Sequence, residues 1–363
     1  MSTKIDDPPL AEALPGFKAD LTQCSVSGLS SGAFMTVQLH LAHSSMFVGA
    51  GVIAGGPYRC AESFRPASMI AEDAYVQNAL FICMNPLIPK AGPNAEQLAE
   101  LARQTAGDKM IDPLDRLAGA RLYIFTGTQD KVVGSSVVKS TKQFYELLGV
   151  DPRNIRFVDD VPAGHAILTT NLEDNPLSAN RPPYINRWPP APEPRMQSRD
   201  ILEFIYPGLK QPAERAAGRL LRFDQREFFD GDSRSSMSAY GYVYVPQAVM
   251  DGARCRVHVA LHGCKQGYNY VDLSNGRPDR ANDPPFGNRY ITTTGYNEVA
   301  EANDIVVLYP QVEGIDNGVT QNPEGCWDWW GYSARSADNP DYYSRDAVQI
   351  KAIHRMLTRL GGG

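Results

Sequence analysis

The sequence predicts an α/β protein with a mostly parallel central sheet and helices on both faces. Short apolar, β-branched segments alternate with helical segments along most of the chain, which is typical of βαβ units. A serine between two glycines separates the first of these strands from the first helix. Acidic and histidine residues follow later strands, at the edge where the carboxyl ends of parallel strands meet. Together these features indicate an enzyme built on one large sheet.

The composition argues against two kinds of partner. The chain has 363 residues, of which 43% are hydrophobic and 21% charged, and no apolar run approaches the length of a membrane span. Its net charge of −6, and the absence of a basic stripe interleaved with aromatic residues, argue against a nucleic-acid partner. An uncharged substrate is therefore more natural. We also expect no cofactor and no metal.

The first half of the chain predicts successive strands of a parallel sheet. The expected strands are residues 24–27, 46–53, 121–126 and 155–158. The expected helices are residues 33–43, 136–148 and 199–205. Strand signals vanish between residues 57 and 118, where helical segments occur, so we interpret this stretch as an insertion or cap. Residues 171–194 are rich in Pro and Asn and predict an irregular but ordered connection.

The second half of the chain repeats the alternation. Its expected strands are residues 219–228, 239–246, 256–261 and 305–309, and its expected helices are residues 296–302 and 345–360. We find no internal repeat and no linker that would tether a second module. We therefore expect one domain over residues 1–363.

A tight turn at Ser30 joins the first strand to the first helix. Gly28-Leu-Ser30-Ser-Gly32 fits a nucleophile elbow, in which a strained serine projects its hydroxyl alone. The flanking glycines avoid collisions with the adjacent strand and helix. The pattern alone is weak, and a plain Gly/Ser turn is the alternative interpretation.

The residues after two later strands support the elbow. A serine nucleophile needs an imidazole base and a carboxylate that orients it. Asp130 follows the third predicted strand, and its alternative role is a turn or N-cap aspartate. His165 follows the fourth strand behind Gly164, as expected for a mobile and exposed base, whereas the other five histidines read as structural. The chain order Ser30, Asp130, His165 is that of an α/β-hydrolase triad.

The position of the oxyanion loop predicts a circular permutation. The site needs two N–H donors, one from Ser31 and one from a loop after a buried strand. The only matching stretch is the strand that runs into His262-Gly263, which lies far downstream of the serine instead of before it. Residues 19–210 would then carry the nucleophile, acid and base of one catalytic domain, and residues 215–363 its oxyanion loop.

Six motifs occur along the chain. They are Gly-Leu-Ser-Ser-Gly at 28–32, Gly-Gly-Pro-Tyr-Arg-Cys at 55–60, Leu-His-Gly-Cys-Lys-Gln at 261–266, Gly-Tyr-Asn-Glu-Val-Ala at 295–300, Val-Leu-Tyr-Pro-Gln at 307–311 and Cys-Trp-Asp-Trp-Trp-Gly at 326–331. Together they resemble poly(3-hydroxybutyrate) depolymerases, and their order resembles the type II catalytic domain. The resemblance implies an esterase of short-chain polyhydroxyalkanoates and their oligomers. It also implies the triad Ser30, Asp130 and His165 and an oxyanion hole formed by Ser31 and Cys264.

An aromatic cluster follows the strand at 305–309. Trp329 and Trp330, then Trp327, are candidates for clamping an aliphatic ester chain, although some of them should belong to the core. Tyr58 and Tyr75, in the insertion, are weaker substrate-binding candidates.

The six cysteines favour disulfides in an oxidising compartment over buried thiols, since they include no CxxC pair. If the strands at 24–28 and 256–261 are parallel neighbours, their first cysteines lie within disulfide distance. We expect the pairs Cys24–Cys255, Cys264–Cys326 and Cys60–Cys83. The N-terminus has no apolar signal segment, so the protein is either cytosolic or has lost a signal peptide, and we favour a secreted or periplasmic protein.

Two other functions are weighed against the esterase. A carbohydrate esterase of the feruloyl or acetyl type would share the triad and differ in its pocket. A non-catalytic binding protein on a hydrolase scaffold is disfavoured, because loss of function usually removes the nucleophile or base first.

Overall fold

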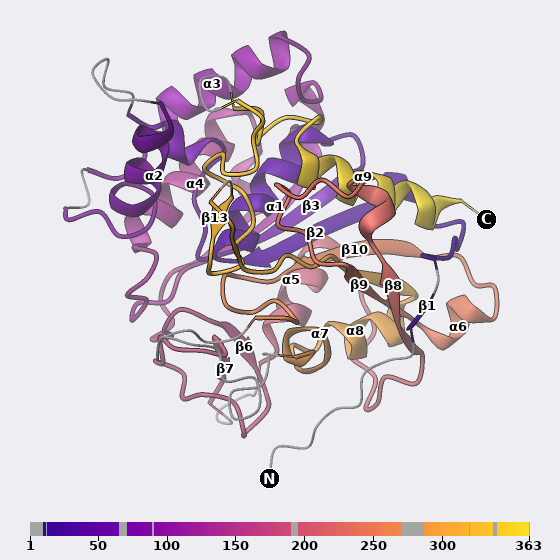
Figure 1. Cartoon of the computed structure of the whole chain (residues 1–363). Helices are drawn as coiled ribbons and strands as arrows, with labels where there is room; N and C mark the ends of the chain where they lie inside the picture. Colours follow the sequence, from indigo (N-terminus) through magenta and orange to yellow (C-terminus); the bar gives the residue numbers. More distant parts are fainter. Residues whose placement is uncertain are drawn as a thin grey trace.

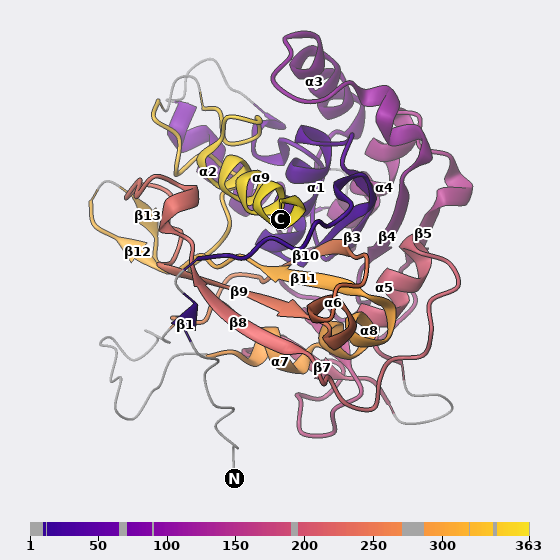
Figure 2. The same ribbon diagram turned by 90° about the vertical axis from the view of Figure 1, so that its right-hand side faces the viewer.

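The computed structural model shows one twisted sheet with helices packed on both faces (Figure 1, Figure 2). The structure describes residues 10–11, 13–64, 71–88, 91–189, 195–270, 287–318, 320–336 and 340–362. None of the helices in these ranges combines the length and apolar character that crossing a membrane requires.

Nine strands of the described chain form the central sheet. Side by side they are β1 (Leu10–Ala11), β8 (Arg219–Asp224), β9 (Tyr240–Val245), β11 (Ile305–Tyr309), β10 (Arg256–Leu261), β2 (Cys24–Leu29), β3 (Phe47–Ile53), β4 (Arg121–Phe125) and β5 (Ile155–Val158). Strand β9 runs antiparallel to both neighbours, and the other neighbouring pairs are parallel. The central strands are buried on both faces, which explains the almost entirely apolar sequences of β3 and β11.

The two halves of the chain meet at the centre of the sheet. Strand β10 lies parallel to β2, with Val259 opposite Val26 and Leu261 opposite Gly28. On its other side β2 pairs with β3, so the strand that leads to Ser30 is central. The strand before the predicted oxyanion loop is therefore next to the strand before the serine, and the predicted circular permutation is confirmed.

Helices cover the sheet from both sides (Figure 2). On one side lie α1 (Ser31–Ala42), α2 (Ala71–Phe81), α3 (Ala95–Gly107), α4 (Ser135–Leu147) and α9 (Val348–Gly361). On the other side lie α5 (Gln197–Ile205), α6 (Gln247–Met250), α7 (Arg289–Thr293) and α8 (Tyr296–Asn303). Helix α1 is buried along its whole length, because it packs on β2 and β3 and is covered by α9.

Outside the central sheet, the described residues form two short pairs of strands. They are β6 (Ile167–Thr169) with β7 (Ile185–Arg187), and β12 (Ile315–Asp316) with β13 (Gln321–Asn322). Strand β7 falls in the stretch that the sequence predicts as an irregular connection. Two or three residues carry too little periodicity to be recognised as a strand.

Two of the three expected disulfides are present. Cys60 is bonded to Cys83, and Cys264 is bonded to Cys326. The second bridge joins the loop after β10 to the start of the tryptophan cluster. It therefore ties together two segments that both approach Ser30.

The expected bridge between Cys24 and Cys255 is wrong, because both cysteines are free and buried. Strands β2 and β10 are neighbours, but Ser25 pairs with His258, so Cys255 lies two residues behind the position opposite Cys24. This offset of about 6.6 Å along the strand, with about 4.8 Å between strands, separates the Cα atoms by roughly 8 Å, beyond disulfide reach. Burial raises the pKa of the Cys24 thiol to about 12, so it stays protonated.

Candidate active site

Ser30 lies at the turn between β2 and α1 with φ 56° and ψ −124°, a conformation that residues with a side chain rarely adopt. A Cβ on Gly28 would lie 2.3 Å from Gly32 O, and a Cβ on Gly32 would lie 2.4 Å from His262 O. Both glycines are therefore required by close backbone contacts, as the elbow predicts. The turn holds Ser30 at the carboxyl end of β2, beside the end of β10.

We expect Gly32→Ala to destabilise the protein by about 2–3 kcal/mol, because the new methyl group must push the elbow away from the carbonyls of Leu261 and His262. Urea unfolding of the variant and the parent protein measures this difference. Gly107→Ala is the matched control, since a Cβ there has no neighbour within 4 Å. Equal stability of the two variants would contradict the close contact between elbow and loop.

Asp130 and His165 meet at the ends of β4 and β5. His165 Nδ1 lies 2.8 Å from Asp130 Oδ2, and both side chains are buried. Because an ionised carboxylate only accepts, Nδ1 carries the proton and Nε2 is left as an acceptor. The other oxygen, Asp130 Oδ1, accepts the N–H groups of Val132 at 2.8 Å and Val133 at 2.9 Å. Asp130 is thus both the partner of the histidine and the turn aspartate of the alternative interpretation.

The expectation that His165 is exposed is wrong. The residue is 3% exposed, and its backbone N–H donates to Asn180 Oδ1 at 2.9 Å. A Cβ on Gly164 would lie 2.1 Å from Ala179 O, so this glycine permits close packing instead of flexibility. The Tyr184 ring packs edge-on against the imidazole, with 5.7 Å between ring centroids.

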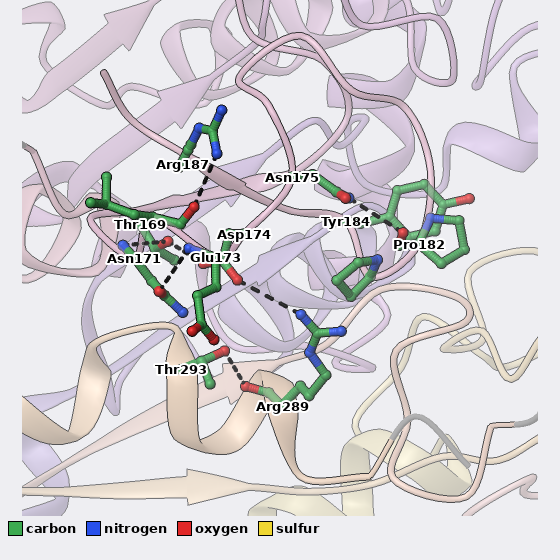
Figure 3. Close-up of polar contacts among 12 residues, drawn as sticks. Thr169, Asn171, Glu173, Asp174, Asn175, Pro182, Tyr184, Arg187, Arg289 and Thr293 are labelled. Carbon is green, nitrogen blue, oxygen red and sulfur yellow. Dashed lines mark hydrogen bonds and ion pairs between the residues drawn. The ribbon is translucent and has the colours of Figure 1, made fainter. Parts of the chain in front are cut away.

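The connection between β6 and β7 holds Tyr184 against His165. Figure 3 shows Asp174 of this connection directed at Arg289 of α7, 3.8 Å away. Asp174 is buried and also accepts a hydrogen bond from Thr169, and burial raises the pKa of its carboxyl group. Sequence reasoning missed Tyr184, because its contacts come from segments that only the tertiary fold brings together.

The loop after β10 is fixed by two side chains. His262 Nδ1 donates to Gly263 O at 2.7 Å, and Gln266 Oε1 accepts the Gly263 N–H at 2.7 Å. The amide nitrogen of Gln266 donates to Pro183 O at 2.8 Å, which links this loop to the connection that carries Tyr184. The loop therefore has little freedom to change its backbone geometry.

Ser31 and Cys264 line the same cavity as Ser30. Ser31 is the first residue of α1, where backbone N–H groups have no partner within the helix. Neither its N–H nor that of Cys264 donates to another group in the part of the chain that the structure describes. A Cβ on Gly263 would lie 3.3 Å from Ser30 Cβ, which places this loop against the serine.

Ser30 and His165 line one cavity of about 880 Å³. The Ser30 hydroxyl forms no hydrogen bond with the residues described, as is common in a site that tightens only with substrate. Its lining includes apolar side chains, among them Val76, Leu80, Met84, Val132 and Val133. The lining also includes polar and charged groups, among them Arg234, Lys265, Asn322 and Glu324.

Three of the five aromatic candidates line this cavity, namely Trp329, Trp330 and Tyr75. Trp329 is stacked on Phe34, with ring centroids 4.0 Å apart, and only 5% of it is exposed. Trp330 packs edge-on against Trp329 and is more exposed. Trp330 therefore offers the larger free surface to a substrate.

The expectation that Trp327 and Tyr58 bind substrate is wrong, because both are fully buried and lie outside the cavity lining. The Trp327 ring packs against His262 beneath the loop after β10. The Tyr58 hydroxyl donates to Tyr343 O at 3.0 Å. These rings fill the core under the site.

Within the described ranges, no three His, Cys, Asp or Glu side chains are arranged to hold a metal ion. The permuted sheet, with the serine elbow at its centre and His165 at the end of its last strand, defines an α/β-hydrolase.

Comparison with known proteins narrows this class. No family model matches the chain. The polyhydroxybutyrate depolymerase of Talaromyces funiculosus is 33% identical over 358 residues, covering 94% of this chain and 93% of that protein. A poly(3-hydroxybutyrate) depolymerase of Delftia acidovorans is 35% identical over 359 residues, covering 96% of this chain and 62% of that protein's length. The chain belongs to the poly(3-hydroxybutyrate) depolymerase family.

Two solved structures agree with this assignment. The crystal structure of PHB depolymerase from Penicillium funiculosum superposes with a TM-score of 0.77 at 30% identity, covering 96% of this chain and 98% of that one. A serine-to-alanine PHB depolymerase complexed with an R3HB trimer gives a TM-score of 0.76 at the same identity and coverage.

Proposed function

We propose that the protein is a serine esterase that hydrolyses poly(3-hydroxybutyrate), related short-chain polyhydroxyalkanoates and their oligomers. The observation that carries this proposal is the site itself. Ser30 in its strained turn, the Asp130–His165 pair and two free N–H groups converge on one cavity. The names of the similar proteins supply the substrate class.

The first step forms an acyl-enzyme. Ser30 Oγ attacks the ester carbonyl carbon, and its proton passes to His165 Nε2. Negative charge develops on the carbonyl oxygen, where the N–H groups of Ser31 and Cys264 stabilise it. The ester C–O bond then breaks, and the leaving alkoxide takes the proton from His165.

The second step releases the acid. A water molecule loses a proton to His165 Nε2 and attacks the acyl carbon on Ser30. The Ser30 oxygen leaves and recovers its proton from His165, so that one ester and one water give one acid and one alcohol. Asp130 keeps the ring in one tautomer throughout, through its contact with Nδ1.

The cavity suits an aliphatic polyester. Its volume of about 880 Å³ accommodates several hydroxybutyrate units, and its apolar side chains can bury their methyl groups. A secreted or periplasmic location accompanies this function in our proposal, since the two disulfides require an oxidising compartment to persist.

A substrate panel tests the proposal. We expect hydrolysis of R3HB trimer and of amorphous poly(3-hydroxybutyrate), with little activity on feruloyl or acetyl sugars of similar size. Faster hydrolysis of the feruloyl or acetyl sugars would replace the depolymerase with a carbohydrate esterase.

We expect Trp330→Ala to lower kcat/KM for R3HB trimer by about tenfold or more and for p-nitrophenyl acetate by less than twofold. Remote contacts help only a substrate long enough to reach them. Burial of the substrate chain against an aromatic face contributes about 2 kcal/mol of binding free energy. Trp330→Phe should keep most of the trimer activity. Equal losses on both substrates would show that Trp330 is structural.

A further inference from the structure

The lining of the active-site cavity includes three basic side chains, and within the described residues only one of them, Lys265, forms an ion pair. Lys265 is paired with Glu324 at 2.7 Å. By contrast, neither Arg234 nor Arg335, which also line the cavity, forms a side-chain ion pair or hydrogen bond with the residues described. The chain as a whole has a net charge of −6, so this local excess of cations stands out.

Two acids lie near these arginines, but neither forms a side-chain ion pair with them. Asp232 directs its Oδ1 to the backbone N–H of Arg234, at 3.0 Å. Burial raises the pKa of the Asp341 carboxyl group, and the attraction of Arg335 offsets this increase only in part. Arg234 is half-buried and Arg335 is exposed, so Arg234 loses more of its hydration in the cavity.

A polyester chain offers only one anionic partner for such cations. Its repeating unit is uncharged, and the single anion of a hydroxyalkanoate oligomer is its terminal carboxylate. The guanidinium fork matches a carboxylate with two parallel hydrogen bonds. The same cavity is also lined by Val76, Leu80 and Val132, whose apolar side chains suit the methyl groups of the same chain.

We propose that Arg234, assisted by the more exposed Arg335, binds the free carboxylate at the end of an oligomeric substrate. This assignment rests on the proposed function and adds to it a preference for chain ends. The carboxylate belongs to the alcohol part of the ester that is cut. Ser30 therefore keeps the remainder of the chain as the acyl group, and the first product released carries the carboxylate.

The kinetics of two nearly identical substrates test this proposal. The parent protein should hydrolyse R3HB trimer as the free acid about tenfold better, in kcat/KM, than its methyl ester, since a hydrogen-bonded charge pair contributes a factor of this size. The advantage should appear in KM and shrink as salt is added. Equal kcat/KM for the two trimers would overturn the proposal.

Variants locate the effect. Arg234→Met should lower kcat/KM for the acid to the value of the methyl ester, while the methyl ester and p-nitrophenyl butyrate change less than twofold. Arg335→Met should give a smaller loss, and Arg234→Lys should restore part of it. Arg116→Met, at an exposed arginine outside the cavity lining, changes the net charge equally and should leave the acid preference intact.

Two results contradict the role of Arg234. If Arg234→Met lowers kcat/KM equally for the acid and the methyl ester, Arg234 is a structural residue. If the preference for the acid is unchanged in this variant, the carboxylate binds elsewhere. Failure of the proposed function looks different, because the parent protein would then hydrolyse neither trimer.

Discussion

Ser30→Ala is expected to lower ester hydrolysis by at least about 10³-fold while the protein keeps its fold. The hydroxyl is the proposed nucleophile, and the remaining oxyanion donors alone give only a small residual rate. The substitution removes one oxygen at the cavity surface and leaves the backbone contacts of Gly28 and Gly32 in place. Initial rates on R3HB trimer and p-nitrophenyl butyrate measure the loss.

Ser31→Ala is the matched control for this prediction. Its hydroxyl accepts the backbone N–H of Trp327 at 3.2 Å, while its own backbone N–H, the proposed oxyanion donor, is retained. We expect it to keep most of the activity. Retention of more than a few per cent of the activity by Ser30→Ala would remove Ser30 from the chemistry.

We expect the free energy of unfolding to fall by about 4 kcal/mol between pH 7 and pH 5.5 through three buried histidines. Burial lowers the pKa of His40 and His258 to about 3 and that of His262 to about 4. In the unfolded chain each titrates near 6.5, so between these values the unfolded state binds about three more protons. The contribution of these neutral histidines to the free energy of unfolding is therefore fully present above pH 7. It is lost as the pH falls, by up to about 1.4 kcal/mol per histidine and pH unit.

The variant His40→Gln isolates one of these contributions. The amide can still accept the hydrogen bond that joins the imidazole to the Tyr145 hydroxyl at 2.9 Å, but it does not titrate. Urea unfolding at both pH values should show a loss about 1.3 kcal/mol smaller in the variant than in the parent protein. The same loss in both would mean that His40 is protonated in the folded state.

The residues around Ser30 could be predicted because their sequence signals are local. The glycines of the elbow, the strand before Asp130 and the strand before His165 each mark their own turn, and the parallel sheet then brings them to one edge. The permutation followed from the position of a single strand, β10, in the chain. These inferences needed only the order of the elements.

The parts that were missed depend on distances between segments. The prediction of a Cys24–Cys255 bridge failed, because a two-residue offset in register cannot be read from either strand alone. Trp327 and Tyr58 look like Trp329 in the sequence, and only packing decides which ring faces the cavity. The buried position of His165 depends on a connection whose residues read merely as irregular.

Mass spectrometry of the acylated protein tests the role of Ser30 most directly. The protein is mixed with an excess of p-nitrophenyl 3-hydroxybutyrate, quenched in acid during the first turnovers and digested. We expect a 3-hydroxybutyryl group on the peptide that contains Ser30 in the parent protein, and no adduct in Ser30→Ala. Substrate turnover with the acyl group on another residue, or with no acyl group at all, would contradict a covalent mechanism at Ser30.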